Sequence, residues 1–234
     1  MKARELYDDR YAAIYRELYI DHPQWRDKNA CNVDIVRSLV SRQSSWLDTF
    51  CGQAWHFSQV REAPRQTGVD ASAAQLRAAR RANPDATFVE ADVLACDAGE
   101  LGRGFDLVTC FWGSLSYLDG AEAIGAFLRR AAAWTAPGGS LYLELITPAT
   151  LEAFNQSGFA AETGSRTAVG AVDGEGAWAW SYEDAGGRHE LCSPPLGFFR
   201  ERLAPWFEGV ELRAMVATMQ QLVAVGRRPQ DARP

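Results

Sequence analysis

Apolar and polar residues follow each other along the chain in short blocks that predict alternating strands and helices. Five β-rich apolar runs occur at residues 45–50, 66–70, 87–92, 105–112 and 140–146. Helix-forming segments separate these runs. Strands that alternate with helices in this way predict a parallel sheet covered by helices on both faces.

Two of the separating segments have distinct helical patterns. Residues 71–83 are rich in Ala, Leu and Arg, which have high helix propensity. Residues 119–135 place their apolar side chains on one face at helical spacing. The turn sequence APGG at 136–139 is expected to end that helix before the next strand.

The pattern changes after residue 150. Residues 151–198 are rich in glycine and aromatic residues, and the turn signals at 173–174 and 186–187 are typical of β-hairpins. We therefore expect this segment to form an inserted antiparallel flap. A short helix at 200–207 and a final pair of strands then bring the expected sheet to seven strands.

Three tyrosines recur at helical spacing ahead of the sheet. Tyr7, Tyr11 and Tyr15 stand at i, i+4 and i+8, which places their phenols along one stripe of a helix. Residues 1–30 are accordingly expected to form a helical cap. The whole chain, 1–234, is then expected to be a single α/β domain, with a mostly parallel sheet between helices and an antiparallel flap beside it.

Composition narrows the possible partners. The 234 residues carry a formal net charge of −6 and the sequence pI is about 5.2, which weighs against a polyanionic partner such as nucleic acid. Five cysteines form no CxxC pair, which argues against a disulfide scaffold or a structural zinc site and for a reducing cytoplasm. Because the chain has no signal-peptide pattern and no run of about 18 apolar residues, no membrane association is expected.

Three successive predicted strands end in acids, namely Asp48, Asp70 and Asp92. Ligands of open parallel sheets bind beyond the carboxyl ends of the strands. An acid after the second strand can accept hydrogen bonds from both ribose hydroxyls, and an acid after the third can accept one from an adenine amino group. Several negative charges and a loop with a single glycine, Gly52, disfavour a pyrophosphate. S-adenosylmethionine fits better, because it carries adenosine and a positive centre but no phosphate.

Five motifs resemble, in order and spacing, those of the class I (Rossmann-like) S-adenosylmethionine-dependent methyltransferases. They are LDTFCGQAWH at 47–56, GVDAS at 68–72, EADV at 90–93, FDLVTCFWGSLSYL at 105–118 and APGGSLYLEL at 136–145. In style the chain is similar to the small bacterial N-methyltransferases of sugar and natural-product pathways.

The resemblance covers roughly residues 30–146 and implies a Rossmann-like, seven-stranded fold that binds S-adenosylmethionine. One position departs from the family pattern: Ala54 stands where a second loop glycine is usual. Alanine adds a single methyl group, so we expect the backbone to approach the cofactor closely there if φ is negative.

The resemblance and the three acids together imply a set of cofactor-binding residues: Tyr11, Tyr15, Arg26, Asp48, Phe50, Gly52, Trp55, His56, Asp70, Ala71, Asp92, Val93, Phe111 and Trp112. The aromatic pair after the fourth strand could stack on adenine and attract the sulfonium, with ordinary core packing as the alternative. Arg26 could pair with the methionine carboxylate or be a solvated surface arginine.

Methyl transfer from a sulfonium is an in-line displacement in which positioning supplies much of the rate. A base helps only where the acceptor must lose a proton. His189, beside a flexible Gly-Gly turn, is the candidate to orient or deprotonate the acceptor, with Glu144 and Tyr15 as substitutes. The alternative for His189 is a surface histidine in a hairpin. No metal is expected, because no acid follows the fourth strand in the manner of metal-dependent catechol enzymes.

The expected function is methyl transfer from S-adenosylmethionine to a small-molecule acceptor, on nitrogen or oxygen rather than carbon. We expect a cytoplasmic monomer or homodimer of bacterial secondary metabolism. One alternative is an enzyme of the same fold that catalyses a cyclisation or rearrangement, and another is a non-catalytic cofactor-binding module. The sequence SPPL at 193–196 lacks the aromatic residue and the position typical of nucleic-acid amino-methyltransferases.

Overall fold

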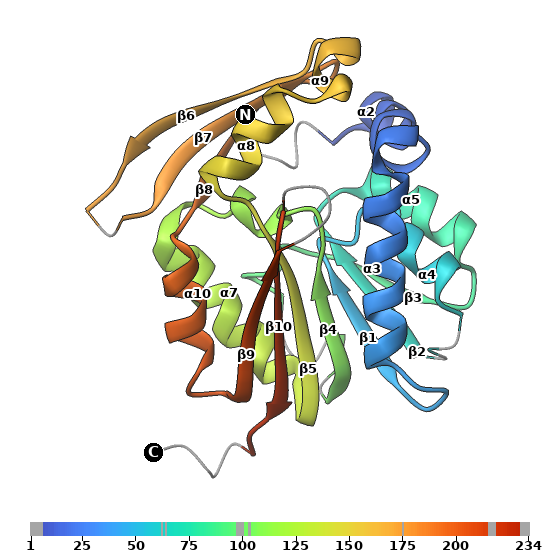
Figure 1. Ribbon diagram of the computed structural model, residues 1–234. Helices are drawn as coiled ribbons and strands as arrows, with labels where there is room; N and C mark the ends of the chain where they lie inside the picture. The colour runs from blue at the N-terminus through green and yellow to red at the C-terminus, as the bar shows by residue number, and fades with distance from the viewer. Residues whose placement is uncertain are drawn as a thin grey trace.

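The computed structural model describes residues 7–61, 63, 65–96, 101–102, 104–174, 176–214 and 219–229 (Figure 1). Its centre is a seven-stranded sheet in the order β3-β2-β1-β4-β5-β10-β9. The strands are β1 Ser45–Thr49, β2 Arg65–Asp70, β3 Thr87–Glu90, β4 Phe105–Cys110, β5 Thr135–Leu145, β9 Phe207–Ala214 and β10 Gln220–Arg227. Strands β1 to β5 are parallel, and β10 is antiparallel to both of its neighbours. The predicted seven-stranded, mostly parallel sheet is confirmed.

Helices cover both faces because side chains alternate along each buried strand. Trp46 and Leu107 point to one face, while their neighbours Leu47 and Val108 point to the other. The first face is covered by α3 Arg26–Leu39, α4 Trp55–Gln59 and α5 Ala73–Ala82, and the second by α7 Gly120–Trp134 and α10 Leu196–Leu203. Helix α10 lies slightly before its predicted range of 200–207.

Strand β5 begins earlier than predicted, at Thr135 rather than at residue 140. Its pairing with β4 shifts register from Phe105–Thr135 to Leu107–Ser140. The turn sequence between these pairs therefore bulges from the ladder instead of separating the helix from the strand.

The segment after β5 contains the predicted antiparallel flap and more. It opens with two helices that sequence analysis missed, α8 (Pro148–Asn155) and α9 (Gly158–Thr163). Three antiparallel strands follow, β6 (Arg166–Val172), β7 (Trp178–Asp184) and β8 (Gly187–Ser193). Both hairpins turn where the sequence signals predicted. We use "flap" below for these three strands.

The residues ahead of α3 are helical, and we use "cap" for residues 7–25. Helix α2 (Asp9–Tyr15) continues into a π-helical turn, Arg16–Ile20, and a 3-10 turn precedes α3. Asp8 caps α2 by accepting a hydrogen bond from the Tyr11 amide at 2.8 Å. Figure 1 shows the cap and the flap at the same end of the sheet, away from the C-terminus.

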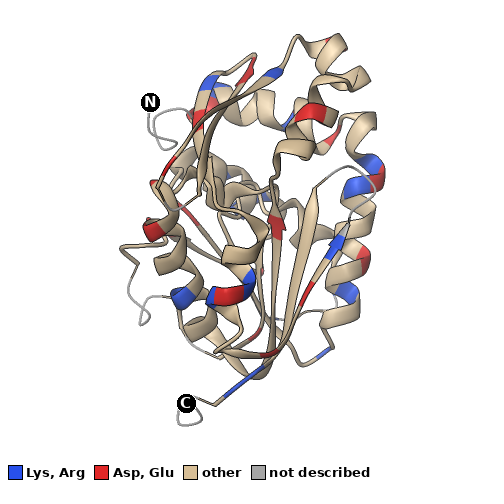
Figure 2. Ribbon diagram, turned by 60° about the vertical axis from the view of Figure 1, so that its left-hand side comes forward, with Lys and Arg blue, Asp and Glu red and all other residues tan. Residues whose placement is uncertain are grey.

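Charged residues of both signs are interspersed on the outer helices (Figure 2). Within the described ranges, no helix is long and apolar enough to cross a membrane. The same ranges hold no group of three or more His, Cys, Asp or Glu side chains placed to bind a metal ion. All five cysteines are free thiols.

Candidate active site

A cavity of about 1050 Å³ lies beyond the carboxyl ends of β1, β2 and β3, between the sheet, the cap and the flap. The strand order reverses between β1 and β4 at this edge, and open α/β sheets bind ligands at such a switch point. The part of the cavity wall that the sheet and its loops form is called the sheet half. It consists of Phe50, Gly52, residues 70–72 and residues 90–94. The wall from the cap, α8 and the flap is the aromatic half, with Tyr19, Trp25, Phe154, Trp180 and Tyr182.

Asp70 organises the sheet half. Its Oδ2 accepts a hydrogen bond from the Gly52 amide at 2.9 Å, and its Oδ1 accepts one from the Ser72 amide at 2.8 Å. The Ala71 amide also bonds to this carboxylate, and because a carboxylate has about four acceptor sites, Asp70 can still accept a hydrogen bond from a ligand. Gly52 has φ +51°, and a Cβ at this position would meet no atom within 4 Å. The loop therefore leaves open space beside Asp70, where a ligand can approach the backbone.

The structure brings together all but one of the predicted cofactor-binding residues. Those on the wall of the main cavity are Tyr11, Tyr15, Phe50, Gly52, Asp70, Ala71, Asp92, Val93 and Trp112. A smaller cavity of about 30 Å³ shares part of this wall and adds Asp48, Trp55, His56 and Phe111. Arg26 is the exception, because it is exposed at the start of α3 and lines a separate surface pocket.

Asp48 is a buried acid beside the smaller cavity. Its Oδ1 accepts a hydrogen bond from Thr109 Oγ1 at 2.6 Å. Burial raises the pKa of Asp48 to about 8, against the opposing effect of that hydrogen bond, and the negative charges of Asp70 and Glu144 raise it further. The carboxyl group is therefore protonated at neutral pH while no cation is near it.

Two buried polar atoms beside Asp48 have no hydrogen-bond partner within the described part of the chain: Asn29 Oδ1 and His56 Nε2. The His56 ring stacks on Phe111 with 3.8 Å between centroids. Burial and nearby Lys28 lower the pKa of His56, so its ring is neutral. Unpartnered buried atoms are costly, and both residues line the smaller cavity, where a ligand could supply the missing hydrogen bonds.

The condition set for close backbone approach at Ala54, a negative φ, is not met. Ala54 has φ +50°, and Phe50 and Trp112 have φ +55° and +59°. Left-handed backbone is uncommon in residues other than glycine, and for bulky side chains it stores strain. All three residues line the smaller cavity, and Phe50 and Trp112 also line the main one. The strain at Ala54 arises because the Cys51–Ala54 turn closes with a hydrogen bond from the Ala54 amide to the Cys51 carbonyl at 2.7 Å.

Glu144, one of the catalytic candidates, lies on the wall of neither cavity. Its Oε2 accepts hydrogen bonds from Lys28 Nζ at 2.8 Å and from the Trp112 amide. Both charged side chains are fully buried, and Lys28 Nζ lies 3.6 Å from the centroid of a Trp112 ring. The buried pair therefore fixes Trp112 through its amide and its ring. Glu144 does not contact an acceptor in the cavity.

His189 is buried on β8, with only 2% of its surface exposed, so it is not the surface histidine of the alternative interpretation. It also does not line the main cavity. Its neighbours are the phenol rings of Tyr7, Tyr11, Tyr117 and Tyr182. The structure therefore separates His189 from the cavity by tyrosines.

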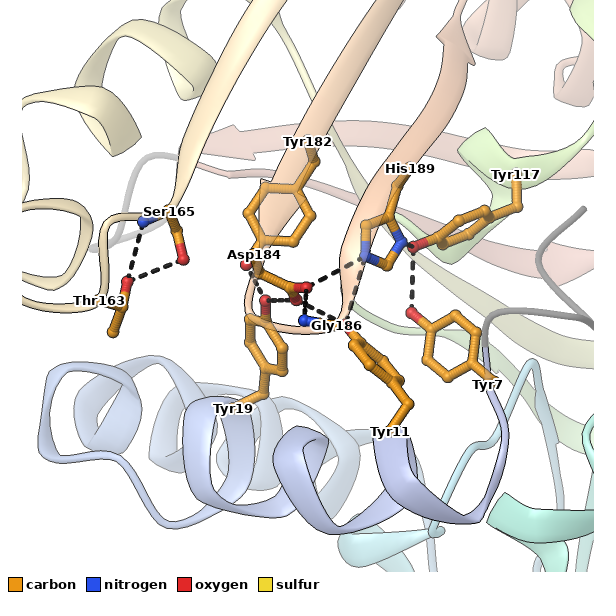
Figure 3. A network of polar contacts seen from close by, with 10 residues as sticks. All are labelled: Tyr7, Tyr11, Tyr19, Tyr117, Thr163, Ser165, Tyr182, Asp184, Gly186 and His189. Carbon is orange, nitrogen blue, oxygen red and sulfur yellow. Dashed lines mark hydrogen bonds and ion pairs between the residues drawn. The ribbon is translucent and has the colours of Figure 1, made fainter. Parts of the chain in front are cut away.

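The cap and the flap meet at Asp184, at the end of β7 (Figure 3). Tyr11 and Tyr19 of the cap both donate a phenolic hydrogen bond to Asp184 Oδ2, at 2.6 and 2.8 Å. Gly186 follows in the hairpin turn, and a Cβ there would lie 1.9 Å from the Tyr11 ring. The absence of a side chain at Gly186 is therefore what lets the Tyr11 ring pack against the flap.

We expect Gly186→Ala to lower the free energy of unfolding by about 1–3 kcal/mol, the usual cost of overpacking. The added methyl group must displace the buried Tyr11 ring from its bond to Asp184. Urea unfolding measures the change. Gly174→Ala in the other flap hairpin is the matched control, because a Cβ there meets no atom within 4 Å. Equal stability losses in the two variants would contradict the role of Gly186.

Sequence analysis missed several residues of this site. Lys28 lies near the end of the predicted cap, 1–30, and shares a helix face with Asn32, which is also buried. Tyr117 closes the loop after β4 and belongs to the motif at 105–118. Tyr182 and Asp184 belong to the aromatic strand of the flap. The position of Tyr117 within its motif was the one signal that could have identified it.

Residues 47–139 match the family model described as a methyltransferase domain. Two curated relatives are sugar N,N-dimethyltransferases. The dTDP-3-amino-3,4,6-trideoxy-α-D-glucopyranose enzyme of Streptomyces venezuelae is 30% identical over 141 residues, which cover 59% of this chain and 58% of the relative. The dTDP-3-amino-3,6-dideoxy-α-D-glucopyranose enzyme of Streptomyces fradiae is 34% identical over 111 residues, which cover 47% and 42%. The chain thus matches about half the length of these relatives.

Solved structures share the fold over nearly the whole chain. The sugar N-methyltransferase KedS8 from Streptoalloteichus has a TM-score of 0.64 and 24% identity, covering 94% of this chain and 93% of that one. The S-adenosylmethionine-bound amino pentose methyltransferase CalS10 from Micromonospora echinaspora has a TM-score of 0.61 and 22% identity, covering 92% and 96%. Residues 47–139 of this chain therefore match a methyltransferase domain, and nearly the whole chain shares the fold of these solved structures.

Proposed function

We propose that this protein transfers a methyl group from S-adenosylmethionine to the amino group of a small molecule of the amino-sugar kind, in a bacterial natural-product pathway. One observation carries the proposal. The single cavity of about 1050 Å³ joins an acid-lined sheet half to an aromatic half built by the cap, α8 and the flap. The curated relatives that methylate sugar amines support nitrogen as the acceptor atom.

The sheet half fits the cofactor chemically. Asp70 can still accept a hydrogen bond from a ribose hydroxyl, and Asp92 with Val93 stands where adenine would lie. A cation bound beside Asp48 favours the charged form of its carboxyl group, and the carbonyl oxygen of Asn29 offers the cation an acceptor atom. When bound, S-adenosylmethionine supplies a methyl group on a cationic sulfur.

The charges of the cavity favour a cationic ligand over a phosphorylated one. Its acids are Asp70, Glu90, Asp92, Asp119 and Glu190, and no Lys or Arg of the described ranges lines it. Aromatic rings attract an ammonium group by cation–π interaction. The aromatic half therefore suits an amine, and we propose that α8 and the flap select which amine enters.

Mass spectrometry of reactions with methyl-labelled S-adenosylmethionine tests the activity. An amino sugar and its hydroxyl analogue are offered as acceptors, and we expect label on the amine only. A rearranged product without label would instead favour the cyclisation alternative. Binding of S-adenosylhomocysteine with no conversion of any amine would favour a non-catalytic module.

The cofactor assignment has its own test in Asp70→Ala. Loss of hydrogen bonds from ribose hydroxyls to a charged group is expected to weaken S-adenosylhomocysteine binding by about 1.5–3 kcal/mol, measured by calorimetry. The matched control is Asp85→Ala, which removes an exposed acid ahead of β3, at the opposite edge of the sheet. Unchanged affinity in Asp70→Ala would remove the ribose assignment.

A further inference from the structure

A chain of polar contacts runs from the cavity wall through His189 to the buried carboxylate of Asp184 (Figure 3). Tyr117 lines the cavity, and its phenol oxygen lies 2.5 Å from His189 Nδ1. On the other side of the ring, His189 Nε2 lies 3.5 Å from Asp184 Oδ1. Both side chains of this pair are fully buried. An imidazole between a carboxylate and a phenol can accept a proton from the phenol.

The neighbouring bonds fix which ring nitrogen carries the proton. The Tyr11 hydroxyl already donates to Asp184 Oδ2 at 2.6 Å, so its oxygen can only accept from His189 Nε2, 3.4 Å away. Nε2 therefore faces two acceptors and carries the hydrogen. In a neutral imidazole, Nδ1 is then unprotonated and accepts the hydroxyl hydrogen of Tyr117.

The Tyr117 oxygen has a second partner on the cavity wall. It lies 3.0 Å from the hydroxyl of Tyr7, a second phenol of that wall. Because the Tyr117 hydrogen goes to His189, the Tyr7 hydroxyl donates to the Tyr117 oxygen. An acceptor N–H group can take the place of the Tyr7 hydroxyl at that oxygen.

We propose that Tyr117 is a catalytic residue that takes a proton from the acceptor amine, with His189 behind it as the proton store and Asp184 as the group that holds His189. The inference rests on the proposed function, and it assigns the amine to the part of the cavity next to Tyr117. His189 thus acts through Tyr117 and is a positioning residue that never touches the acceptor.

The proton transfers balance. An ammonium acceptor must lose one proton before its nitrogen can take a methyl group. That proton moves to the Tyr117 oxygen while the hydroxyl proton of Tyr117 moves to His189 Nδ1, so the phenol stays neutral and an imidazolium forms beside Asp184. The nitrogen–methyl bond then forms as the sulfur–methyl bond breaks. The stored proton returns through Tyr117 to solvent when the products leave.

The groups around His189 suit this role. The cap presents Tyr7 and Tyr11, the loop after β4 presents Tyr117, and β7 presents Tyr182 and Asp184. Burial raises the pKa of Asp184, but hydrogen bonds from His189 and Tyr11 outweigh it, and the pKa lies below its ordinary value. Burial raises the pKa of Tyr117. A carboxylate that stays charged therefore faces the imidazolium, and Tyr117 passes a proton without becoming a phenolate.

The test is the pH dependence of kcat from pH 6 to 9, with both substrates saturating. We expect the parent to lose rate on the acidic side, because an imidazolium cannot accept a proton from Tyr117. Tyr117→Phe removes one oxygen, and His189→Gln keeps a hydrogen-bonding side chain without a basic nitrogen. Each is expected to lower kcat about 10²-fold at neutral pH and to abolish the acidic limb. The double variant should be about as slow as either single one, because the residues act as a unit.

The control must separate proton transfer from the structural contact between cap and flap. Tyr19→Phe removes another phenol hydroxyl from Asp184 but leaves the path from Tyr117 to His189 intact. The kcat profile of this variant should therefore keep its acidic limb, even if the KM of the variant changes. Calorimetry with S-adenosylhomocysteine and a thermal melt confirm that each variant folds. If His189→Gln does not fold, Tyr117→Phe decides alone.

Three outcomes are distinct. A Tyr117→Phe enzyme within about threefold of the parent at every pH overturns the proposal. Loss of the acidic limb in Tyr19→Phe also overturns it, because the network would then be structural. A parent that methylates no amine contradicts the proposed function itself, whereas normal turnover in all variants contradicts only the role of Tyr117.

Discussion

Replacing Lys28 with methionine is expected to lower the free energy of unfolding by about 3–5 kcal/mol, the cost of leaving a buried charge without its partner. Lys28 and Glu144 are both fully buried and are joined at 2.8 Å. Burial lowers the pKa of Lys28, and Glu144 opposes that shift. Methionine fills a similar volume but cannot neutralise Glu144. Urea unfolding at pH 7 measures the loss.

The double variant Lys28→Met with Glu144→Gln is the control for this prediction. The glutamine carbonyl can still accept the hydrogen bond of the Trp112 amide, and no unpaired charge remains. We therefore expect most of the lost stability to return, since a buried ion pair can be replaced by neutral residues at little cost. If the double variant is as unstable as Lys28→Met, the prediction is contradicted. Lys28 would then stabilise the protein by packing against Trp112 and not by neutralising Glu144.

Cofactor affinity is expected to rise with pH by up to about tenfold per unit on the acidic side of pH 8, and to level off above it. The cause is Asp48, whose pKa is about 8 in the empty protein. A cation bound beside the carboxyl favours its charged form and lowers that pKa, so binding releases a proton. Below both pKa values the affinity no longer changes. Calorimetry with S-adenosylmethionine from pH 5 to 9 measures the slope.

Asp48→Asn isolates this effect from the titration of the cofactor's own amino group. Asparagine can still accept the hydrogen bond from Thr109 but has no proton to release. The difference between the two pH profiles belongs to Asp48, and identical profiles would contradict the prediction. The raised pKa of Asp48 also makes the free energy of unfolding depend on pH. The contribution of Asp48 to stability is greatest at low pH and is lost as the pH rises to about 8, because the folded state favours the protonated carboxyl.

The sheet and its acids could be predicted because both follow from local sequence. Asp48 and Asp70 end strands whose apolar runs are plain, and the carboxyl ends of parallel strands meet at one edge. The helix α8 was missed although Thr147 and Pro148 form a good start signal for a helix. The glycine and aromatic content of the following segment suggested only strands.

The aromatic half could not be predicted, because it depends on contacts between distant residues. Tyr117 and His189 are 72 positions apart, and Lys28 and Glu144 are 116 apart. The π-helical turn Arg16–Ile20 places Tyr19 where it contacts the flap. The spacing of the tyrosines in the sequence does not reveal such a turn. The strain at Ala54 likewise comes from closure of a turn, against the preference of alanine.

The two halves of the cavity have different origins in the chain, and this bears on how such an enzyme diversifies. The sheet half comes from within residues 47–139, the part that matches the family model. The aromatic half comes from the cap, α8 and the flap, which lie outside it. Mutations in these outer segments can change which acceptor fits without disturbing the residues around the cofactor. Related proteins of this fold can therefore keep the same reaction while their outer segments evolve to bind different acceptors.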